Sequence, residues 1–285
     1  MITLSKKALA LNIGAVAVIG FAFISLARST FARAYVEPCT SRYHSQVNMR
    51  LDRDGVPLTA SELQGVANGL DEGLLDHLTI AQFNNGPAKF AMGVKINKGS
   101  TQQRSAHGEP GGISLPWTPN SLEQLTAACL SYDVFLPATF DFNTGGTLPG
   151  LFGTTANGRF GDVPHFGTNL SWAGGGEPRH YLETKAADNE NAAAFKTYEH
   201  ALARGRWVHV DQEIVLNTPE QSDGVARLWL DGRIESEVKG VYMRADAKMS
   251  IAGVAGEVYF GGSGSTGVAT NDEIIWLSPF QLRWN

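Results

Sequence analysis

The chain has very little cysteine. Only Cys39 and Cys129 occur among its 285 residues, which excludes a cysteine-rich metal cluster and a scaffold held together by many disulfides. In an oxidising compartment, an even pair of cysteines forms a disulfide more often than a catalytic or metal-binding set. We therefore expect a Cys39–Cys129 disulfide that ties the N-terminal segment to the rest of the chain, with two separate buried thiols as the alternative.

The sequence also lacks a strong excess of charge of either sign. Its 23 Lys and Arg residues nearly balance 28 Asp and Glu residues, so the formal net charge is −5 and the pI is near 5.8. A nucleic-acid-binding domain usually carries a clustered basic face. No nucleic-acid partner is therefore expected, and a polyanionic partner would need local basic residues.

Metal-binding motifs and repeats are absent from the sequence. It has no His-x-x-His pair, and Asp52-Arg53-Asp54-Gly55 is too short for a calcium-binding loop and is typical of a turn. No tandem repeat is visible, which disfavours a propeller or a solenoid. The sequence therefore predicts neither a metal nor a cofactor.

The first 34 residues have the pattern of a targeting segment. Lys6 and Lys7 precede an uncharged apolar run from Ala8 to Ala27, and Ala32-Arg33-Ala34 offers a small-x-small cleavage site. We expect residues 1–34 to be a signal peptide and the protein to be secreted or periplasmic. The run is also long enough for an uncleaved membrane anchor with the rest of the protein outside the cytoplasm, and this alternative stays open.

Residues 35–285 have the pattern of one β domain. The chain contains 32 glycines and 12 prolines, and from Tyr132 onward short aromatic and β-branched runs alternate with turn formers such as Gly145-Gly146 and Asp231-Gly232. This pattern favours a sandwich or jelly roll. The expected strands are 132–142, 165–172, 179–185, 206–217, 225–231, 240–251, 256–261 and 273–284. One amphipathic helix is expected from Thr59 to Leu78, capped by Thr59 or Ser61.

Several C-terminal segments share the motifs of one known family. They are Leu130 to Pro137, Phe140 to Gly153 with its Gly-Gly-Thr-Leu-Pro-Gly-Leu run, Arg206 to Pro219, Asp223 to Gly232, and Tyr259-Phe-Gly-Gly262. In this order they resemble polysaccharide lyase family 14, the family of alginate and glucuronan lyases, over residues 128–285. The resemblance implies an all-β, concanavalin-like jelly-roll sandwich that follows a short N-terminal helical and loop segment.

The resemblance also implies the β-elimination that cleaves uronic-acid polysaccharides. This reaction needs a group that neutralises the uronate carboxylate, a base, and an acid for the leaving oxygen. The family places these roles on the Lys of a Gly-Gly-Lys turn, a Ser-x-Arg pair and a Tyr-x-Tyr pair. In this sequence Thr147 stands at the Lys, Gly167 and Asn169 at the Ser-x-Arg pair, and Tyr181 and Glu183 at the Tyr-x-Tyr pair.

Strand alternation places the candidate residues on common faces. The side chains expected to project together from one strand are Arg179, Tyr181, Glu183 and Lys185. Asn169 could hydrogen-bond a uronate from the preceding strand, and Tyr181 could act as acid or base. The charged members of the set, together with Thr147, would then contact the polysaccharide.

Other residues are candidates through their own chemistry. An ordinary histidine titrates near neutrality, so His180 would replace Tyr181 as a catalytic group if the matching shifts by one residue. Arg227 and Trp229 share a strand face, so the indole could stack on a sugar ring while the guanidinium pairs with a carboxylate.

Hypotheses from different classes remain open. The first is an extracytoplasmic polysaccharide lyase, and the second is a non-catalytic glycan-binding or envelope structural protein on the same fold. Hydrolysis is a minor hypothesis, because Asp211 and Glu213 alternate with His209 in a pattern similar to the paired carboxylates of glycoside hydrolases. In each of the first two hypotheses any membrane contact would be made through residues 1–34.

Overall fold

The computed structural model describes residues 35–67, 72–102, 109–120, 122, 124–156, 158–186, 189–261 and 267–285. Glu37–Asn285 form one compact unit. The targeting segment expected at residues 1–34 lies outside the described residues. Among the described residues, no helix is long and apolar enough to cross a membrane.

Most of the compact unit is built from two sets of strands. The first set is β1 (Ser45–Asn48), β4 (Leu78–Gln82), β5 (Phe90–Ile96), β9 (Ala127–Phe135), β14 (Trp207–Val215), β15 (Gly224–Leu230), β16 (Arg233–Val241), β18 (Glu273–Leu277) and β19 (Gln281–Trp284). The second set is β8 (Ile113–Trp117), β10 (Gly145–Thr155), β11 (His165–Ala173), β12 (Pro178–Ala186), β13 (Asn189–Lys196) and β17 (Met249–Phe260). The short elements are η1 (Cys39–Ser41), β2 (Asp52–Arg53), β3 (Val56–Pro57), α2 (Ala60–Ala67), α3 (Leu74–His77), β6 (Ser100–Thr101), β7 (Glu109–Pro110) and η2 (Gly174–Gly176).

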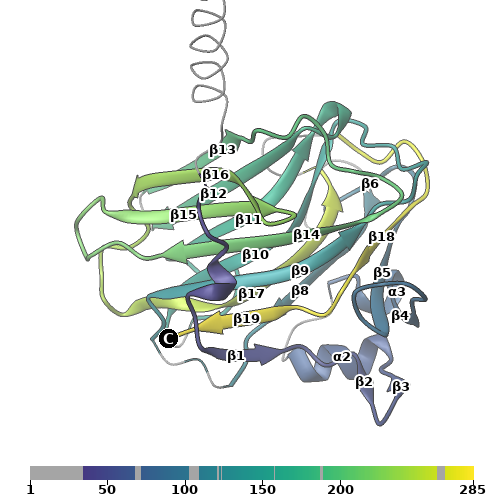
Figure 1. The fold of residues 1–285 in the computed structure, drawn as a ribbon, viewed down its shortest axis with the longest axis horizontal. Coiled ribbons are helices and arrows are strands. Elements are labelled where there is room, and N and C mark those ends of the chain that lie inside the picture. The colour runs from purple at the N-terminus through teal and green to yellow at the C-terminus, as the bar shows by residue number, and fades with distance from the viewer. Residues whose placement is uncertain are drawn as a thin grey trace, which may run out of the picture. The chain divides into compact units, whose positions relative to one another are not determined.

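The two sets form two large antiparallel sheets (Figure 1). The nine-stranded sheet has the order β16-β15-β14-β9-β18-β5-β4, with β19 beside β9 and β1 beside β19. The six-stranded sheet has the order β13-β12-β11-β10-β17-β8. The fold is therefore the β-sandwich of jelly-roll type that the sequence predicts.

The hydrophobic core lies between the sheets. Successive strand residues point to opposite faces, so Phe166, Leu170 and Trp172 of β11 are at most 3% exposed and join one core cluster with Val210 and Leu228 from the other sheet. Apolar burial of this kind contributes roughly 25 cal/mol per Å². The alternate residues of β11 and β12 are left on the outward face.

The strand β10 corrects the expected turn at Gly145-Gly146. These residues begin a long central strand instead, because glycine lets the neighbouring strands approach closely. A Cβ atom on Gly146 would lie 2.2 Å from the Trp172 ring, and one on Gly150 would lie 1.6 Å from the Thr168 carbonyl oxygen. The glycines of β10 are thus a packing requirement of the central sheet.

The expected helix from Thr59 to Leu78 is shorter in the structure. Thr59 caps α2 through a reciprocal capping box, in which Glu62 N donates to Thr59 Oγ1 at 3.2 Å and Thr59 N donates to Glu62 Oε2 at 2.9 Å. Gly73 takes a left-handed φ of 81° before α3, and Leu78 already begins β4. The apolar spacing therefore continues across two short helices and into a strand.

The expected strand at 240–251 is divided between the end of β16 and the start of β17. Asn217 Oδ1 accepts the backbone N–H groups of Met243 and Arg244, both at 2.9 Å. These donors are thereby used by a side chain, so they do not continue a sheet ladder. In contrast, the expected Asp231-Gly232 turn is present, with φ angles of 49° and 73° between β15 and β16.

Candidate functional site

The outward side of the six-stranded sheet around β11 and β12 gathers most of the predicted site residues. We call it the β11–β12 face, defined by Thr147, Asn169, Arg179, Tyr181 and Glu183. Asn169 pairs directly with Tyr181, and Gly167 pairs with Glu183. Ser171 of β11 pairs with Arg179 on β12 and with Thr147 on β10. The backbone pairing therefore brings residues from three strands onto one surface.

Tyr181 and Glu183 contact one another on this face. The Tyr181 hydroxyl donates a hydrogen bond to Glu183 Oε2 at 3.3 Å. The other carboxylate oxygen, Glu183 Oε1, lies 3.6 Å from His165 Nε2, and the Glu183 side chain is 38% exposed. A phenol and a solvent-accessible carboxylate are thus held together, an arrangement that can exchange protons.

Asn169 and Arg179 carry unused hydrogen-bonding capacity. Within the described residues, the buried Asn169 Oδ1 and Arg179 Nε have no hydrogen-bond partner. Arg179 Nη2 binds Glu177 Oε2 at 2.8 Å, so its charge is shared. The Lys185 side chain, predicted to project from the same strand, lies outside the described part of the structure.

Tyr259 joins this face from β17, although sequence reasoning assigned it no role in the site. It pairs with Thr147 and is 9% exposed. Its phenol hydrogen-bonds Thr147 and Glu257 and interacts electrostatically with Glu183. Burial and the nearby Glu257 charge raise the pKa of Tyr259 well above its ordinary value, so the phenol stays neutral. The alternation of Glu257 and Tyr259 with buried Val258 is the signal that could have found it.

Thr147 is more deeply buried than a polysaccharide contact would require. It is 1% exposed, and its hydroxyl is used by Tyr259 and by the Gly261 carbonyl, the latter at 3.4 Å. The prediction that Thr147 contacts substrate is therefore wrong, because the Tyr259 side chain occupies the space beside it.

The prediction of a catalytic role for His180 is also wrong. Strand alternation turns this side chain inward, where it is fully buried and contacts Thr168 Oγ1 at 2.8 Å and Ser236 Oγ at 3.1 Å. Burial lowers the pKa of His180 to about 3, so the imidazole is neutral. Tyr181 is consequently the member of the pair on the outward face.

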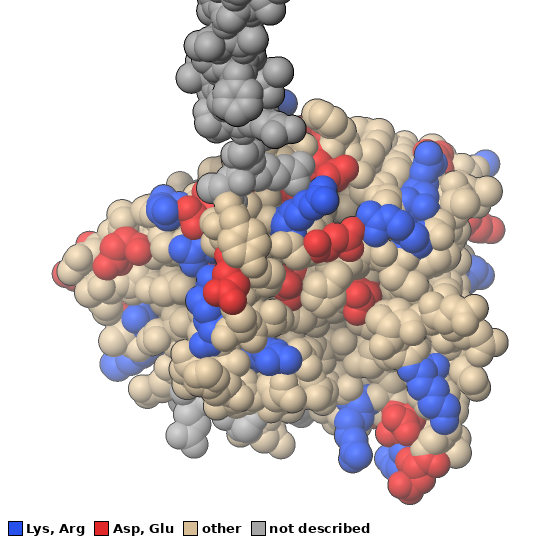
Figure 2. Space-filling view, viewed as in Figure 1, with Lys and Arg blue, Asp and Glu red and all other residues tan. Residues whose placement is uncertain are grey.

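Arg227 and Trp229 lie on the other sheet, so their predicted contact with the same substrate is wrong. Arg227 binds Glu213 and Glu237, each at 2.6 Å. Trp229 is fully buried beneath the Arg42 guanidinium, 5.6 Å from the ring centroid. Figure 2 shows positive and negative side chains interspersed over this side of the molecule. The outward faces of a sandwich point in opposite directions, which separates these residues from Tyr181.

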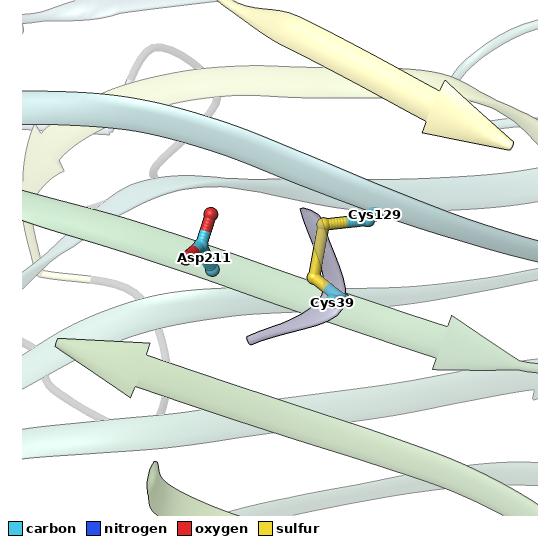
Figure 3. A group of neighbouring side chains, drawn as sticks. All are labelled: Cys39, Cys129 and Asp211. Atoms are coloured by element: carbon cyan, nitrogen blue, oxygen red, sulfur yellow. A yellow bond between two sulfur atoms is a disulfide. The ribbon is translucent and has the colours of Figure 1, made fainter. Parts of the chain in front are cut away.

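The disulfide and Asp211 lie on that same nine-stranded sheet. Cys39 and Cys129 are bonded with a Cα–Cα distance of 5.7 Å, which joins η1 to β9, and Figure 3 shows Asp211 of β14 beside them. Both sulfurs are used by the disulfide, so neither is a thiolate available to a metal. The expected tie between the N-terminal segment and the sandwich is present.

Asp211 belongs to a hydrogen-bonded network instead of a hydrolytic pair. It accepts from Ser131 at 2.5 Å and lies 3.3 Å from His209, whose other ring nitrogen is 2.9 Å from Asp133. Hydrogen bonds to Asp133 and Asp211 raise the pKa of His209 to about 10. The protonated His209 ring pairs with the Asp211 carboxylate, which is 2% exposed. The alternation of Asp211 and Glu213 therefore gives no support to hydrolysis.

Comparison with known proteins places this fold among polysaccharide lyases. The alginate lyase from Aplysia kurodai has 21% identity and a TM-score of 0.68, with 85% of this chain and 99% of that chain covered. An alginate lyase from Chlorella virus has 17% identity, 73% and 89% coverage and a TM-score of 0.61. The endo-β-1,4-glucuronan lyase from Trichoderma reesei has 14% identity, 74% and 91% coverage and a TM-score of 0.52.

The family model for polysaccharide lyase 14 matches residues 84–280, a span that starts earlier than the expected residue 128. No match is found among curated proteins. The structural matches establish the shared fold, and the family match covers most of the chain. This chain therefore belongs to the polysaccharide lyase 14 family.

Proposed function

We propose that this protein cleaves a uronic-acid polysaccharide by β-elimination on the β11–β12 face. The observation that carries the proposal is the direct pairing of Asn169 with Tyr181 on the outward side of the sheet. Asn169 supplies an amide whose Nδ2 group can donate to a carboxylate, and Tyr181 supplies a phenol. A sugar placed over this pair meets both groups at once.

The two side chains fit the roles that elimination requires. Hydrogen bonds from the Asn169 amide to the uronate carboxylate would stabilise the negative charge that develops when the neighbouring C5 proton leaves. Tyr181 would transfer a proton at the glycosidic oxygen. Arg179 adds a positive charge beside them for a further carboxylate of the polymer. The alginate and glucuronan lyases that share this fold support a polymer of this class.

Glycan binding without cleavage is the second candidate function, and one observation favours it. Where the family has a Lys, this chain has the buried Thr147 under Tyr259. The cation expected to act on the uronate is therefore replaced by uncharged groups. The face would still offer the Tyr181 ring and polar side chains to a sugar. An envelope structural role is left if neither binding nor cleavage is measured.

We further propose that the protein works outside the cytoplasm, with residues 1–34 as a signal peptide or an anchor. The Cys39–Cys129 disulfide supports this proposal, because structural disulfides persist mainly in oxidising compartments. Mass spectrometry of the mature protein from cell fractions tests it. Recovery of the intact N-terminus in the cytoplasm, with both thiols reduced, would contradict the proposal.

The function is tested by incubating the purified protein with alginate, glucuronan and related polymers. Cleavage by β-elimination creates an unsaturated uronate that absorbs in the ultraviolet. Tyr181→Phe should lower turnover at least about 100-fold, because it removes the proton-transfer group. Tyr43→Phe is the matched control, since it also removes a phenol hydroxyl but one that binds Glu213 on the other sheet. Binding without new absorbance would favour the second candidate, and full activity of Tyr181→Phe would place the site elsewhere.

A further inference from the structure

Gly167 lies beside Glu183 at a position where the fold does not require a glycine. Gly167 is the direct partner of Glu183 on the neighbouring strand, and a Cβ atom added to it would meet nothing closer than 3.6 Å. That distance is ordinary van der Waals contact. Gly150 differs, since its Cβ atom would lie 1.6 Å from a carbonyl oxygen. Packing therefore explains Gly150 but leaves Gly167 unexplained, and the residue paired with Glu183 puts no side chain against the carboxylate.

Several titratable groups face the Glu183 carboxylate. Tyr181 donates to it from the same strand, His165 approaches it from β11, and Tyr259 interacts with it from β17. The Glu183 side chain remains 38% exposed despite these neighbours. A carboxylate that is partly exposed and hydrogen-bonded to a phenol can receive a proton from a ligand above the sheet.

We propose that Glu183 is the base of the reaction, with the reacting sugar seated over Gly167 and Tyr181 acting as the acid. This inference rests on the proposed lyase function and assigns its two proton-transfer roles. It also gives a chemical role to the replacement of the second family tyrosine by glutamate.

The proton transfers balance without any added reactant. Glu183 takes the proton from C5, and the electron pair of that C–H bond becomes the C4=C5 double bond. The C4–O4 bond breaks with its electron pair on O4, which receives the Tyr181 proton. The products are an unsaturated uronate and a chain that ends in a hydroxyl group.

The 3.3 Å hydrogen bond between Tyr181 and Glu183 then provides a path by which both groups regain their starting protonation. After the reaction Glu183 holds a proton and Tyr181 is a phenolate. Carboxylic acids are stronger acids than phenols by about six pKa units in model compounds. Return of the proton from Glu183 to Tyr181 is therefore downhill, and it restores both groups directly.

The test compares Glu183→Gln with the wild-type protein on the polymer that is cleaved. Glutamine keeps the shape and can still accept from Tyr181, but it cannot take a proton at neutral pH. We expect kcat to fall at least about 100-fold, with KM within about threefold of wild type. An unchanged melting temperature shows that Glu183→Gln is folded.

A second variant, Gly167→Val, tests the position of the sugar. Its branched side chain would stand where we seat the sugar, so kcat/KM should fall at least about tenfold, and an unchanged melting temperature shows that the variant is folded. Wild-type turnover by Glu183→Gln would overturn the assignment of the base and leave the lyase function standing. Undiminished activity of Gly167→Val would overturn the proposed position of the sugar. Failure of the wild-type protein to cleave any polymer would remove the proposed function, and this inference with it.

Discussion

The outward faces of the two sheets carry similar residues and use them differently. On the nine-stranded sheet, Glu213 is 1% exposed and binds Arg42 at 2.7 Å and Arg227 at 2.6 Å. On the six-stranded sheet, Glu183 is 38% exposed and contacts Tyr181 through one hydrogen bond. Carboxylates saturated by cations hold the fold together, whereas an accessible carboxylate beside a phenol is available to a ligand. The two faces thus differ in whether the carboxylate is paired with arginines, as Glu213 is, or is accessible to a ligand, as Glu183 is.

The N-terminal residues from Cys39 to Tyr43 lie against the nine-stranded sheet. Figure 1 shows η1 lying over β14 and β9, and Tyr43 reaches Glu213 Oε1 at 2.8 Å. Desolvation and the Glu213 charge raise the pKa of Tyr43 above its ordinary range. This cover explains how Trp229 is fully buried on the outer side of a sheet.

Removing the disulfide should have the largest effect on stability. Cys39→Ser with Cys129→Ser opens a link between residues separated by 90 positions, and the chain-entropy model assigns about 4.6 kcal/mol to such a link. Urea unfolding of the double variant measures the loss. Polymer cleavage at low denaturant should remain, because the disulfide lies on the other sheet. A loss below about 1 kcal/mol would show that the cover contributes little to the fold.

The same substitution on the two faces should have opposite consequences. Glu213→Gln leaves Arg42 and Arg227 without their shared carboxylate, so we expect a loss of about 3 kcal/mol, the low end for a broken buried ion pair. Glu183→Gln should change the unfolding free energy by less than about 1 kcal/mol and should lower turnover. Equilibrium unfolding and ultraviolet absorbance assays measure both. Equal stability losses for the two variants would contradict the contrast between the faces.

Acid should destabilise the protein through His180. The pKa of His180 is about 3 in the folded state because of burial, against about 6.5 in an unfolded chain. The stabilising contribution of the neutral ring is complete above pH 6.5 and is lost progressively as pH falls toward 3. Between pH 7 and pH 5 the loss is about 2 kcal/mol. His180→Gln should show a correspondingly weaker dependence of unfolding free energy on pH, and an identical dependence would contradict the buried neutral state.

Much of the candidate site follows from local sequence pattern. The period of two along a strand predicts that Arg179, Tyr181 and Glu183 share a face, and the structure places all three outward. The match to family motifs also predicts that Asn169 is near Tyr181, and the β11–β12 register pairs them directly. The same alternation turns His180 inward. Local periodicity succeeds here because neighbouring strands are joined by a short turn.

Other features required knowledge of which sheet each strand enters. Arg227 and Trp229 have suitable chemistry for a sugar, but β15 belongs to the nine-stranded sheet. Tyr259 enters the candidate site because β17 pairs with β10, more than 100 residues earlier in the chain. In the sequence the glycines of β10 have the pattern of turn formers. In the structure they are required by the close approach of the adjacent strands.

The sequence by itself determined the β class, the family, the possible cysteine pair and the alternation that exposes Tyr181. These depend on residue type and on spacing along one strand. Only the tertiary structure decided that Thr147 is buried, that Tyr259 joins Glu183, and that Arg227 faces the opposite side. The physical reason is that pairing between distant strands sets which polar groups neutralise each other, and local periodicity does not contain that pairing.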